Sequence, residues 1–267
     1  MAPQFVKPYR KSSKTDRNDA EAICEAVGRP NMRFVSVKSV EQQAVLTVHR
    51  ARQLAVAGRT ALVNQVRGLL AEFGIVMPKG RKALRPALAA ILGDAENELP
   101  FTARETIGEV YEQLVAQDRR IAVYDRRIDA LAESTPAAKR LMELEGVGAV
   151  TATAAVATVG DAKVFENGRQ LSAWIGLTPR NSGSGGKTVP GRMSKQGDRY
   201  LRTLLIHGAR AVLRVADRKT DPKSQWAAAL KRRVGNNKAA VALAAKHARI
   251  VWALLAHEQP YQPARAA

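Results

Sequence analysis

Residues 105–133, ETIGEVYEQLVAQDRRIAVYDRRIDALAE, indicate the fold class of this chain. Apolar residues recur there at alternating intervals of three and four positions, which is the spacing of the a and d positions of a coiled coil. The a positions are Ile107, Leu114, Ile121 and Ile128, and the d positions are Val110, Gln117, Tyr124 and Leu131. The pattern is interrupted once, at the polar Gln117. It predicts a long helix that packs against another helix.

The stretch from Ser39 to Phe73 shows a less strict helical pattern and predicts the partner of that helix. We expect residues 38–135 to form an antiparallel coiled-coil arm, within one chain or between chains. Its two helices are separated by a linker at residues 74–103, where proline and glycine break the pattern. Two helices of an ordinary bundle are the alternative interpretation.

The helical pattern stops at Ser134-Thr135-Pro136, where we expect a second helical domain to begin. This domain would extend over residues 136–259, and residues 260–267 would form a disordered tail. The chain of 267 residues is long enough for one large hydrophobic core or two smaller ones. We therefore predict a mainly α-helical protein.

Composition excludes several classes of protein. No uncharged apolar stretch approaches the ~20 residues that span a bilayer, so no membrane protein is expected. The basic residues near the N-terminus are not followed by an apolar segment, so no secretory signal is expected either. The single cysteine, Cys24, cannot form an internal disulfide, which fits a reducing cytoplasm.

The charge of the chain predicts a polyanionic partner. The net charge is +19, and residues 151–267 carry 20 basic and 6 acidic side chains, a net of +14. Only 5% of the residues are aromatic, which disfavours binding of single strands by base stacking. We therefore expect nucleic acid to bind through its phosphates, with an affinity that falls steeply with salt.

A glycine-containing turn opens the second helical domain. Residues 141–154 have the layout of a helix, a turn containing Gly146 and Gly148, and an alanine-rich second helix. This is the layout of a helix-hairpin-helix motif, in which glycines allow the amides of the turn to approach a phosphate. A turn between two packed helices without any ligand is the alternative.

Two aspartates near the N-terminus could bind a metal ion. If a helix begins at Asp16, then Asp16 and Asp19 occupy positions i and i+3, so both carboxylates lie on one face. Such a pair could bind Mg²⁺ through its oxygen atoms. Helix capping explains the same two aspartates without a metal.

The stretch from Gly176 to Arg202 contains the second group of candidate residues. We expect a flexible glycine- and serine-rich loop at residues 178–187, followed by a basic segment that enters a helix. A serine in this loop, Ser182 or Ser184, could act as a nucleophile in phosphoryl transfer. The cations that could neutralise a phosphate are Arg180, Lys187, Arg192, Lys195, Arg199 and Arg202. A loop that binds without catalysing is the alternative.

Taken together, these motifs resemble the DEDD transposases of insertion-sequence family 110, subgroup 1111. The resemblance rests on KTDRNDAEAI at residues 14–23, on GLTPR at 176–180, and on the serine–glycine stretch with SKQGDRYLR at 194–202. It implies an RNase H-like N-terminal domain with four metal-binding acids, a coiled coil, and a transposase domain with a helix-hairpin-helix. It also implies a recombinase that uses Mg²⁺, a serine nucleophile and a bridge RNA that selects the DNA.

Matched residue by residue, Asp16 and Asp19 correspond to the third and fourth acids of the DEDD set. Ser184 corresponds best to the nucleophile. Ser182 is its competitor, because the family pattern has two adjacent hydroxyl residues before the glycine, whereas here Gly183 separates the two serines. Arg180 and Lys187 would be neighbours of the phosphate. The resemblance further implies a homodimer or homotetramer.

The sequence departs from the family pattern at the first two acids, because only 15 residues precede Asp16. Residues 1–37 are therefore expected to be the C-terminal remnant of the RNase H-like domain in an N-terminally truncated chain, and two carboxylates would bind Mg²⁺ weakly. We expect impaired strand exchange, with nucleic-acid binding and oligomerisation retained. The alternative is a non-catalytic nucleic-acid-binding fragment that regulates a full-length transposase.

Overall fold

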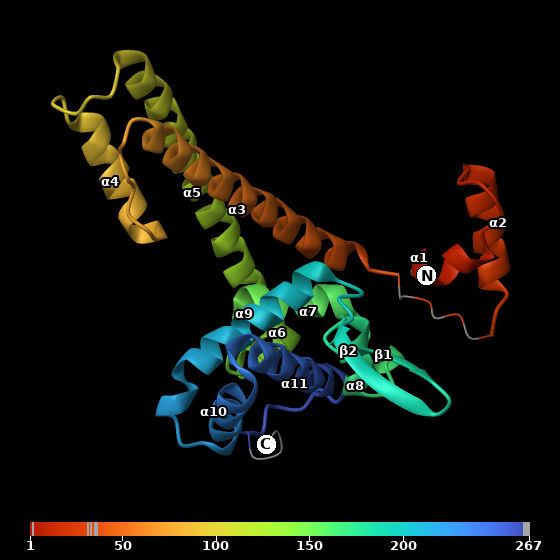
Figure 1. Ribbon diagram of the computed structural model, residues 1–267. Helices are drawn as coiled ribbons and strands as arrows, with labels where there is room; N and C mark the ends of the chain where they lie inside the picture. The colour runs from red at the N-terminus through yellow and green to blue at the C-terminus, as the bar shows by residue number, and fades with distance from the viewer. Residues whose placement is uncertain (2, 31, 33, 35–36, 264–267) are drawn as a thin grey trace. The chain divides into compact units, whose positions relative to one another are not determined.

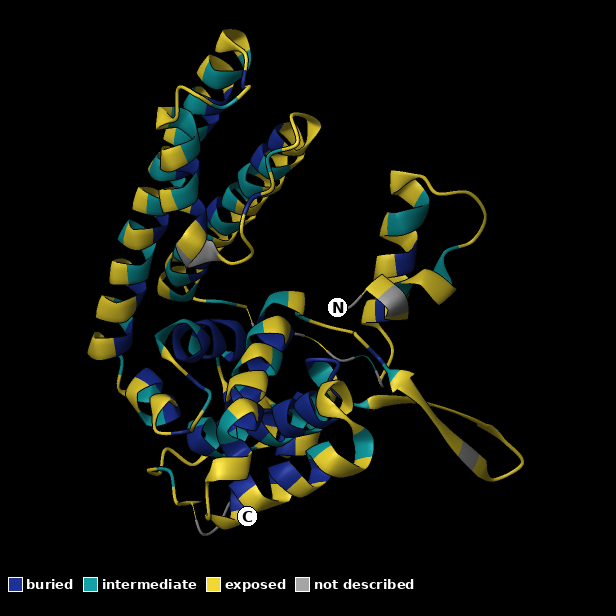
Figure 2. Ribbon diagram, turned by 60° about the vertical axis from the view of Figure 1, so that its left-hand side comes forward, coloured by how far each residue is buried: buried dark blue, intermediate teal, exposed yellow. Residues whose placement is uncertain are grey.

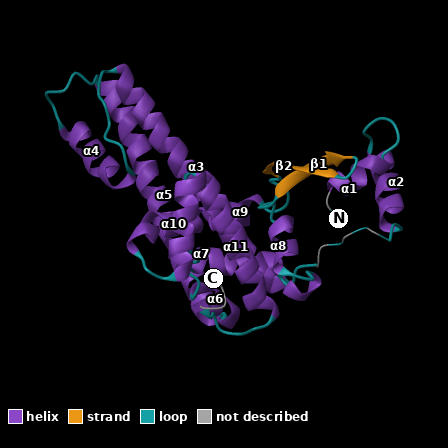
Figure 3. Cartoon of the chain, turned by 60° about the horizontal axis from the view of Figure 1, so that its bottom comes forward, coloured by secondary structure: helices purple, strands orange, loops and turns teal. Residues whose placement is uncertain are grey.

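The computed structural model describes residues 1, 3–30, 32, 34 and 37–263, and it confirms the prediction of a mainly α-helical protein (Figure 1). The chain forms two compact units. One unit consists of Met1–Gln43 together with Pro136–Ala267, and the other consists of Ala44–Thr135. Among the described residues, the only sheet is a two-stranded hairpin, coloured orange in Figure 3.

The unit formed by Ala44–Thr135 contains most of the two long helices that the heptad pattern predicts. They are α3 (Val40–Glu72) and α5 (Phe101–Ser134), and α4 (Arg81–Gly93) lies within the linker. The predicted seam of α5 is largely inside the unit, since it buries Ile107, Val110, Leu114, Ile121 and Ile128. Burial of these positions explains why the seam contains almost no charge.

Two ion pairs show how α3 and α5 align. Arg52 Nε lies 2.5 Å from Asp125 Oδ1, and Arg59 Nη1 lies 3.4 Å from Asp118 Oδ1. A step of seven residues forward on α3 thus matches a step of seven residues back on α5, so the helices are antiparallel. The polar interruption of the seam, Gln117, faces Gly58, where an added Cβ would lie 3.6 Å from Gln117 Nε2. The coiled-coil geometry of the arm stays a prediction.

The C-terminal part of the other unit is built around α11 (Asn236–Ala256), which contacts α6, α8, α9 and α10. These and the remaining helices of this part are α6 (Pro136–Met142), α7 (Ala149–Val159), η2 (Ala162–Val164), α8 (Gly168–Trp174), α9 (Arg199–Val215), η3 (Ala216–Arg218) and α10 (Pro222–Val234). The buried face of α11 is mainly alanine and leucine, and alanines allow neighbouring helices to approach closely.

Helix α11 is long and apolar enough to cross a membrane by length and composition. It nevertheless carries Lys246 and Arg249, and its buried residues pack against four other helices. These contacts identify α11 as the central helix of its unit.

The N-terminal residues form short helices, α1 (Pro3–Val6), η1 (Lys7–Tyr9) and α2 (Asp16–Val27), which contact one another. Thr15 caps α2, because its side chain accepts a hydrogen bond from the Asn18 amide at 3.3 Å. The described part of residues 1–37 is thus helical where it has regular structure. Residues 31, 33, 35 and 36 lie outside the described part of the chain.

The expected loop at residues 178–187 is wrong, because residues 179–187 belong to a β-hairpin. Strand β1 (Pro179–Ser184) pairs in an antiparallel manner with β2 (Lys187–Met193). Two glycines, Gly185 and Gly186, connect the strands with φ values of +58° and +79°. Two residues with positive φ form the turn whose twist matches that of paired strands, and glycine adopts this conformation with little strain.

The beginning of the predicted tail is attached to the C-terminal helices. The Tyr261 amide donates a hydrogen bond to Glu143 Oε2 at 2.8 Å, and Lys223 Nζ lies 5.7 Å from the centre of the Tyr261 ring. Residues 264–267 of the predicted tail lie outside the described residues.

The buried His247 of α11 predicts a loss of stability in acid. Burial and the charges of Lys223 and Lys246 lower the pKa of His247 to about 3. In the described part of the chain neither ring nitrogen has a hydrogen-bond partner. The unfolded chain takes up this proton near its ordinary pKa of 6.5, so between pH 6.5 and 3 the unfolded state binds more protons and is favoured.

We therefore expect the free energy of unfolding of this unit to fall by about 2 kcal/mol from pH 7.5 to 5 through His247 alone. Urea titrations followed by tryptophan fluorescence would measure it. His247→Leu is expected to remove this part of the pH dependence. An equal loss in wild type and variant would contradict the assignment.

Candidate active site and nucleic-acid interface

The hairpin exposes both candidate serines on one face. Side chains alternate along a strand, so Ser182 and Ser184 point to the same side. In the register of the hairpin, Ser182 pairs with Val189 and Ser184 pairs with Lys187. Residues 179–187 are exposed, and the hairpin is coloured yellow in Figure 2. The hairpin therefore presents Ser184 beside the turn, directly opposite a lysine.

Four further candidate cations lie along the hairpin and just beyond it. Arg180 and Arg192 are exposed on the two strands, and Lys195 and Arg199 are exposed between β2 and the first turn of α9. Arg180 Nη2 also donates to the Ser194 carbonyl at 3.3 Å. Together with Lys187, these residues place five exposed cations on or next to one short segment, an arrangement that attracts phosphates.

The base of the hairpin is joined to the C-terminal helices by backbone contacts. The Ser194 amide donates to the Thr178 carbonyl at 2.9 Å, and the Lys195 amide donates to the Gly176 carbonyl at 3.2 Å. Gly176 and Gly197 both have positive φ and pack against backbone atoms of the facing segment. An isolated two-stranded hairpin is only marginally stable in water, so this base is what orients the strands.

Arg202 belongs to the base of the hairpin and not to its surface. Only 8% of Arg202 is exposed. Its Nη1 donates to the carbonyls of Ile175, at 2.8 Å, and Gln196, at 2.6 Å. Burial lowers the pKa of Arg202. This guanidinium joins the end of α8 to the loop before α9, so its prediction as a phosphate-binding cation is wrong.

The two glycines of the predicted helix-hairpin-helix turn have different surroundings. Gly146 has a φ of +86°, and a Cβ there would lie 2.8 Å from the Gly208 carbonyl oxygen of α9. Gly148 precedes α7 and is exposed, and a Cβ there would meet no described atom within 4 Å. Gly146 therefore allows close packing on α9, while Gly148 leaves the amides that begin α7 open. Nucleic-acid binding by this turn stays a prediction.

Asp16 and Asp19 occupy the first turn of α2, as the sequence predicts. Arg10 Nη1 lies 3.7 Å from Asp19 Oδ1, so one of the two carboxylates faces a cation. Among the described residues, no group of three or more histidine, cysteine, aspartate or glutamate side chains is placed to hold a metal ion. Magnesium usually requires a near-octahedral set of oxygen ligands, so these two carboxylates alone do not form a complete site.

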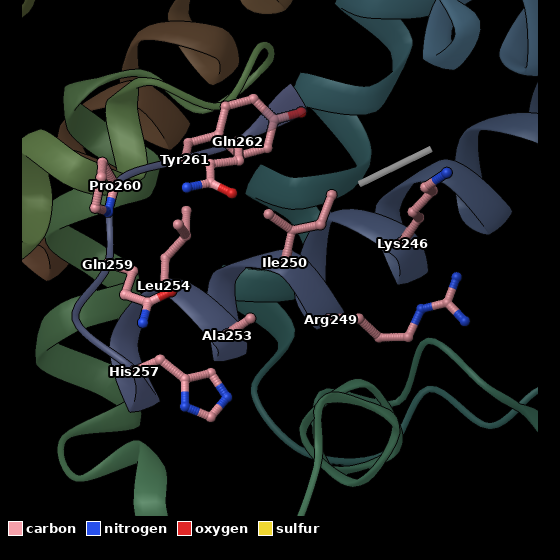
Figure 4. Close-up of a pocket in the computed structure, with 10 residues that line it drawn as sticks. All are labelled: Lys246, Arg249, Ile250, Ala253, Leu254, His257, Gln259, Pro260, Tyr261 and Gln262. Carbon is pink, nitrogen blue, oxygen red and sulfur yellow. The ribbon is translucent and has the colours of Figure 1, made fainter. Parts of the chain in front are cut away.

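A groove with basic residues lies on the same unit, between α11 and the segment that follows it (Figure 4). Its volume is about 420 Å³. Lys246 and Arg249 line it beside apolar residues of α11, and Gln259 to Gln262 form its other wall. Lys246 Nζ lies 4.7 Å from the centre of the Trp226 ring, a cation–π contact that fixes this charge.

Two known families match this chain. Residues 138–225 match the family described as Transposase IS116/IS110/IS902, and residues 1–75 match the DEDD transposase family of IS110. The chain is 49% identical to a probable family 20 transposase of Pseudomonas aeruginosa, over 98% of this chain and 78% of that protein.

Two further relatives agree with this match. A transposase of insertion sequence IS1111A from Coxiella burnetii is 46% identical over 98% of this chain and 72% of its own length. A putative transposase of Sinorhizobium fredii is 38% identical over 99% and 68%, respectively. These likenesses confirm the resemblance seen in the sequence: the chain belongs to the IS110 family of transposases.

Proposed function

We propose that this transposase cleaves and exchanges DNA strands through its hairpin, with Ser184 as the nucleophile. The observation that carries the proposal is the position of Ser184. It is exposed beside the turn of the hairpin and lies opposite Lys187, and backbone hydrogen bonds hold the base of the hairpin on the C-terminal helices. Ser182 is the competing nucleophile, because it lies on the same face two residues earlier.

The reaction would be a transesterification. Ser184 Oγ attacks a DNA phosphorus atom, a serine–phosphate bond forms, and one bridging P–O bond breaks. The proton lost by the serine hydroxyl balances the proton gained by the DNA oxygen that leaves. Attack by the hydroxyl of a second DNA strand on this phosphoserine would rejoin the backbone and regenerate Ser184.

The exposed cations around the hairpin would bind the phosphates next to the scissile one. Arg180, Lys187, Arg192, Lys195 and Arg199 are all exposed. Charge-assisted hydrogen bonds from such groups to phosphate are stronger than neutral ones. Arg202 is inside the base and would act as a positioning residue for the hairpin.

Magnesium is proposed to bind at Asp16 and Asp19, which would supply two carboxylate ligands. Bound there, the ion would stabilise negative charge on a phosphate. Because Arg10 already faces Asp19, we expect weak Mg²⁺ binding and slow unaided catalysis. A bridge RNA that selects the DNA, and a dimer or tetramer, belong to the same proposal. The net charge of +14 on residues 151–267 supports a nucleic-acid partner.

The second candidate function is nucleic-acid binding without catalysis. It is favoured by the incomplete set of carboxylates at α2. The exposed cations of the hairpin would then bind phosphates, and Ser182 and Ser184 would at most donate hydrogen bonds.

Trapping the covalent intermediate would separate the two functions. The full chain would be incubated with Mg²⁺, a plasmid carrying the element and its flanks, and RNA transcribed from its non-coding ends. We expect a protein–DNA adduct that survives denaturation, and mass spectrometry should locate it at Ser184. Strand transfer without a serine adduct would overturn the nucleophile assignment, whereas binding with neither adduct nor transfer would support the non-catalytic function.

A further inference from the structure

Helix α9 has an apolar buried face and, on its opposite side, a basic exposed face. Its buried residues include Leu201, Leu205, Ala209, Val212 and Leu213. The opposite side, which we call the α9 basic face, is exposed and consists of Arg199, Thr203, His207, Arg210 and Arg214.

The geometry of an α-helix aligns the three arginines of this face. At 3.6 residues per turn, Arg199, Arg210 and Arg214 project within about 60° of one another around the helix axis. At 1.5 Å per residue, they extend over about 22 Å. Successive phosphates recur every ~3.4 Å along the axis of each strand of a duplex, so a face of this length can meet several of them.

Four of the six acidic residues in 151–267 have other partners. Asp161, Asp198 and Asp221 each accept a capping hydrogen bond at the start of a helix, at 2.8, 2.7 and 2.9 Å. Asp217 pairs with Lys231 at 2.7 Å and with Arg232 at 3.5 Å, both on α10.

The arginines of the α9 basic face lack such partners. No ion pair in the described part of the chain involves them, and Arg210 donates only to the neutral Asn237 amide oxygen, at 3.3 Å. Among the described residues, their positive charge therefore has no carboxylate partner, whereas Lys231 and Arg232 on α10 share the carboxylate of Asp217.

From this arrangement we propose that the α9 basic face binds the phosphate backbone of duplex DNA. The face carries no tryptophan, tyrosine or phenylalanine side chain, which disfavours a single strand held by stacking on these rings. Arg199 follows β2 by a short loop, so the face begins where the hairpin ends. This inference rests on the proposed function, since DNA cut at Ser184 would leave the hairpin along α9.

Salt-dependent binding would test the proposal. The full chain and the triple variant Arg199→Gln/Arg210→Gln/Arg214→Gln would be titrated with a labelled 30-bp DNA duplex at several salt concentrations. Each phosphate contact contributes about 0.9 to the slope of log K against log salt. We expect the triple variant to bind more weakly and its slope to be smaller in magnitude by about 2 to 3. Because these side chains are exposed, the variant is expected to keep its fold.

A single pair of variants provides the matched control. Arg214→Gln removes a charge that has no carboxylate partner among the described residues. Arg232→Gln removes the same group where the carboxylate of Asp217, shared with Lys231, partly offsets it. We expect only Arg214→Gln to reduce the slope clearly. An unchanged slope in the triple variant, or equal changes in the two single variants, would overturn the proposal.

A parallel titration with a hairpin RNA distinguishes the two nucleic acids. Loss of RNA binding with unchanged DNA binding in the triple variant would overturn the assignment to DNA. The result is independent of Ser184, since binding slopes require no strand transfer. Failure of the serine mechanism would therefore be seen in the adduct experiment and not in this one.

Discussion

Ser184→Ala is expected to lower the rate of strand transfer by about 10⁴-fold or more, because loss of a covalent nucleophile removes the reaction path that it provides. DNA affinity should stay within about twofold, since a single exposed hydroxyl adds little to binding by several cations. Transfer would be measured by the appearance of joined product, and affinity by the change in anisotropy of a labelled duplex.

Ser182→Ala is the matched control for this prediction. Both serines lie on the same face of β1 and both are exposed, so the two variants differ only in position along the strand. We expect Ser182→Ala to retain most of the transfer rate. The opposite ranking would assign the nucleophile to Ser182. Equal loss of binding and transfer in both variants would support the purely binding function.

Gly197→Ala is expected to destabilise the unit that carries the hairpin by about 3–4 kcal/mol. Gly197 has a φ of +69°, and a Cβ there would lie 1.8 Å from the Trp174 carbonyl oxygen. An alanine would therefore add backbone strain and force apart two backbone segments that form the base of the hairpin. All three tryptophans, Trp174, Trp226 and Trp252, lie in this unit, so urea titration followed by their fluorescence would measure the loss.

Gly185→Ala is the control for backbone strain without a clash. Gly185 has a φ of +58°, but no described atom lies within 4 Å of an added Cβ. Its cost should be about 1 kcal/mol, the cost of a left-handed conformation for a residue with a side chain. If the two alanine variants were equally stable, the close approach of residues 174 and 197 could not be what holds the hairpin.

The helical part of the fold was predictable because its signal is local. The seam positions of α5 repeat along the chain, and every buried residue among them needs only a neighbouring helix to pack against. The start of α2 at Asp16 and the two aspartates in its first turn were visible in the same way, whereas the capping residue is Thr15. The family could also be recognised, because its motifs are short and contiguous.

The hairpin was missed because its strands lack the usual signal. Strand β1 has the sequence PRNSGS and is exposed along its whole length, so no alternation of apolar and polar residues marks it. The Gly185-Gly186 pair was the available clue, since two glycines between extended segments are typical of a tight hairpin turn.

Local periodicity and composition thus specify which segments are helices, where positive charge accumulates and which motifs are present. They do not specify the roles of Arg199 and Arg202, which lie three residues apart on α9. Arg199 is exposed, and Arg202 is buried against carbonyls from residues 175 and 196. The carbonyls of residues 175 and 196 become neighbours only when the backbone segments at Gly176 and Gly197 meet. That contact depends on the packing of residues that are distant along the chain, so local sequence does not specify it.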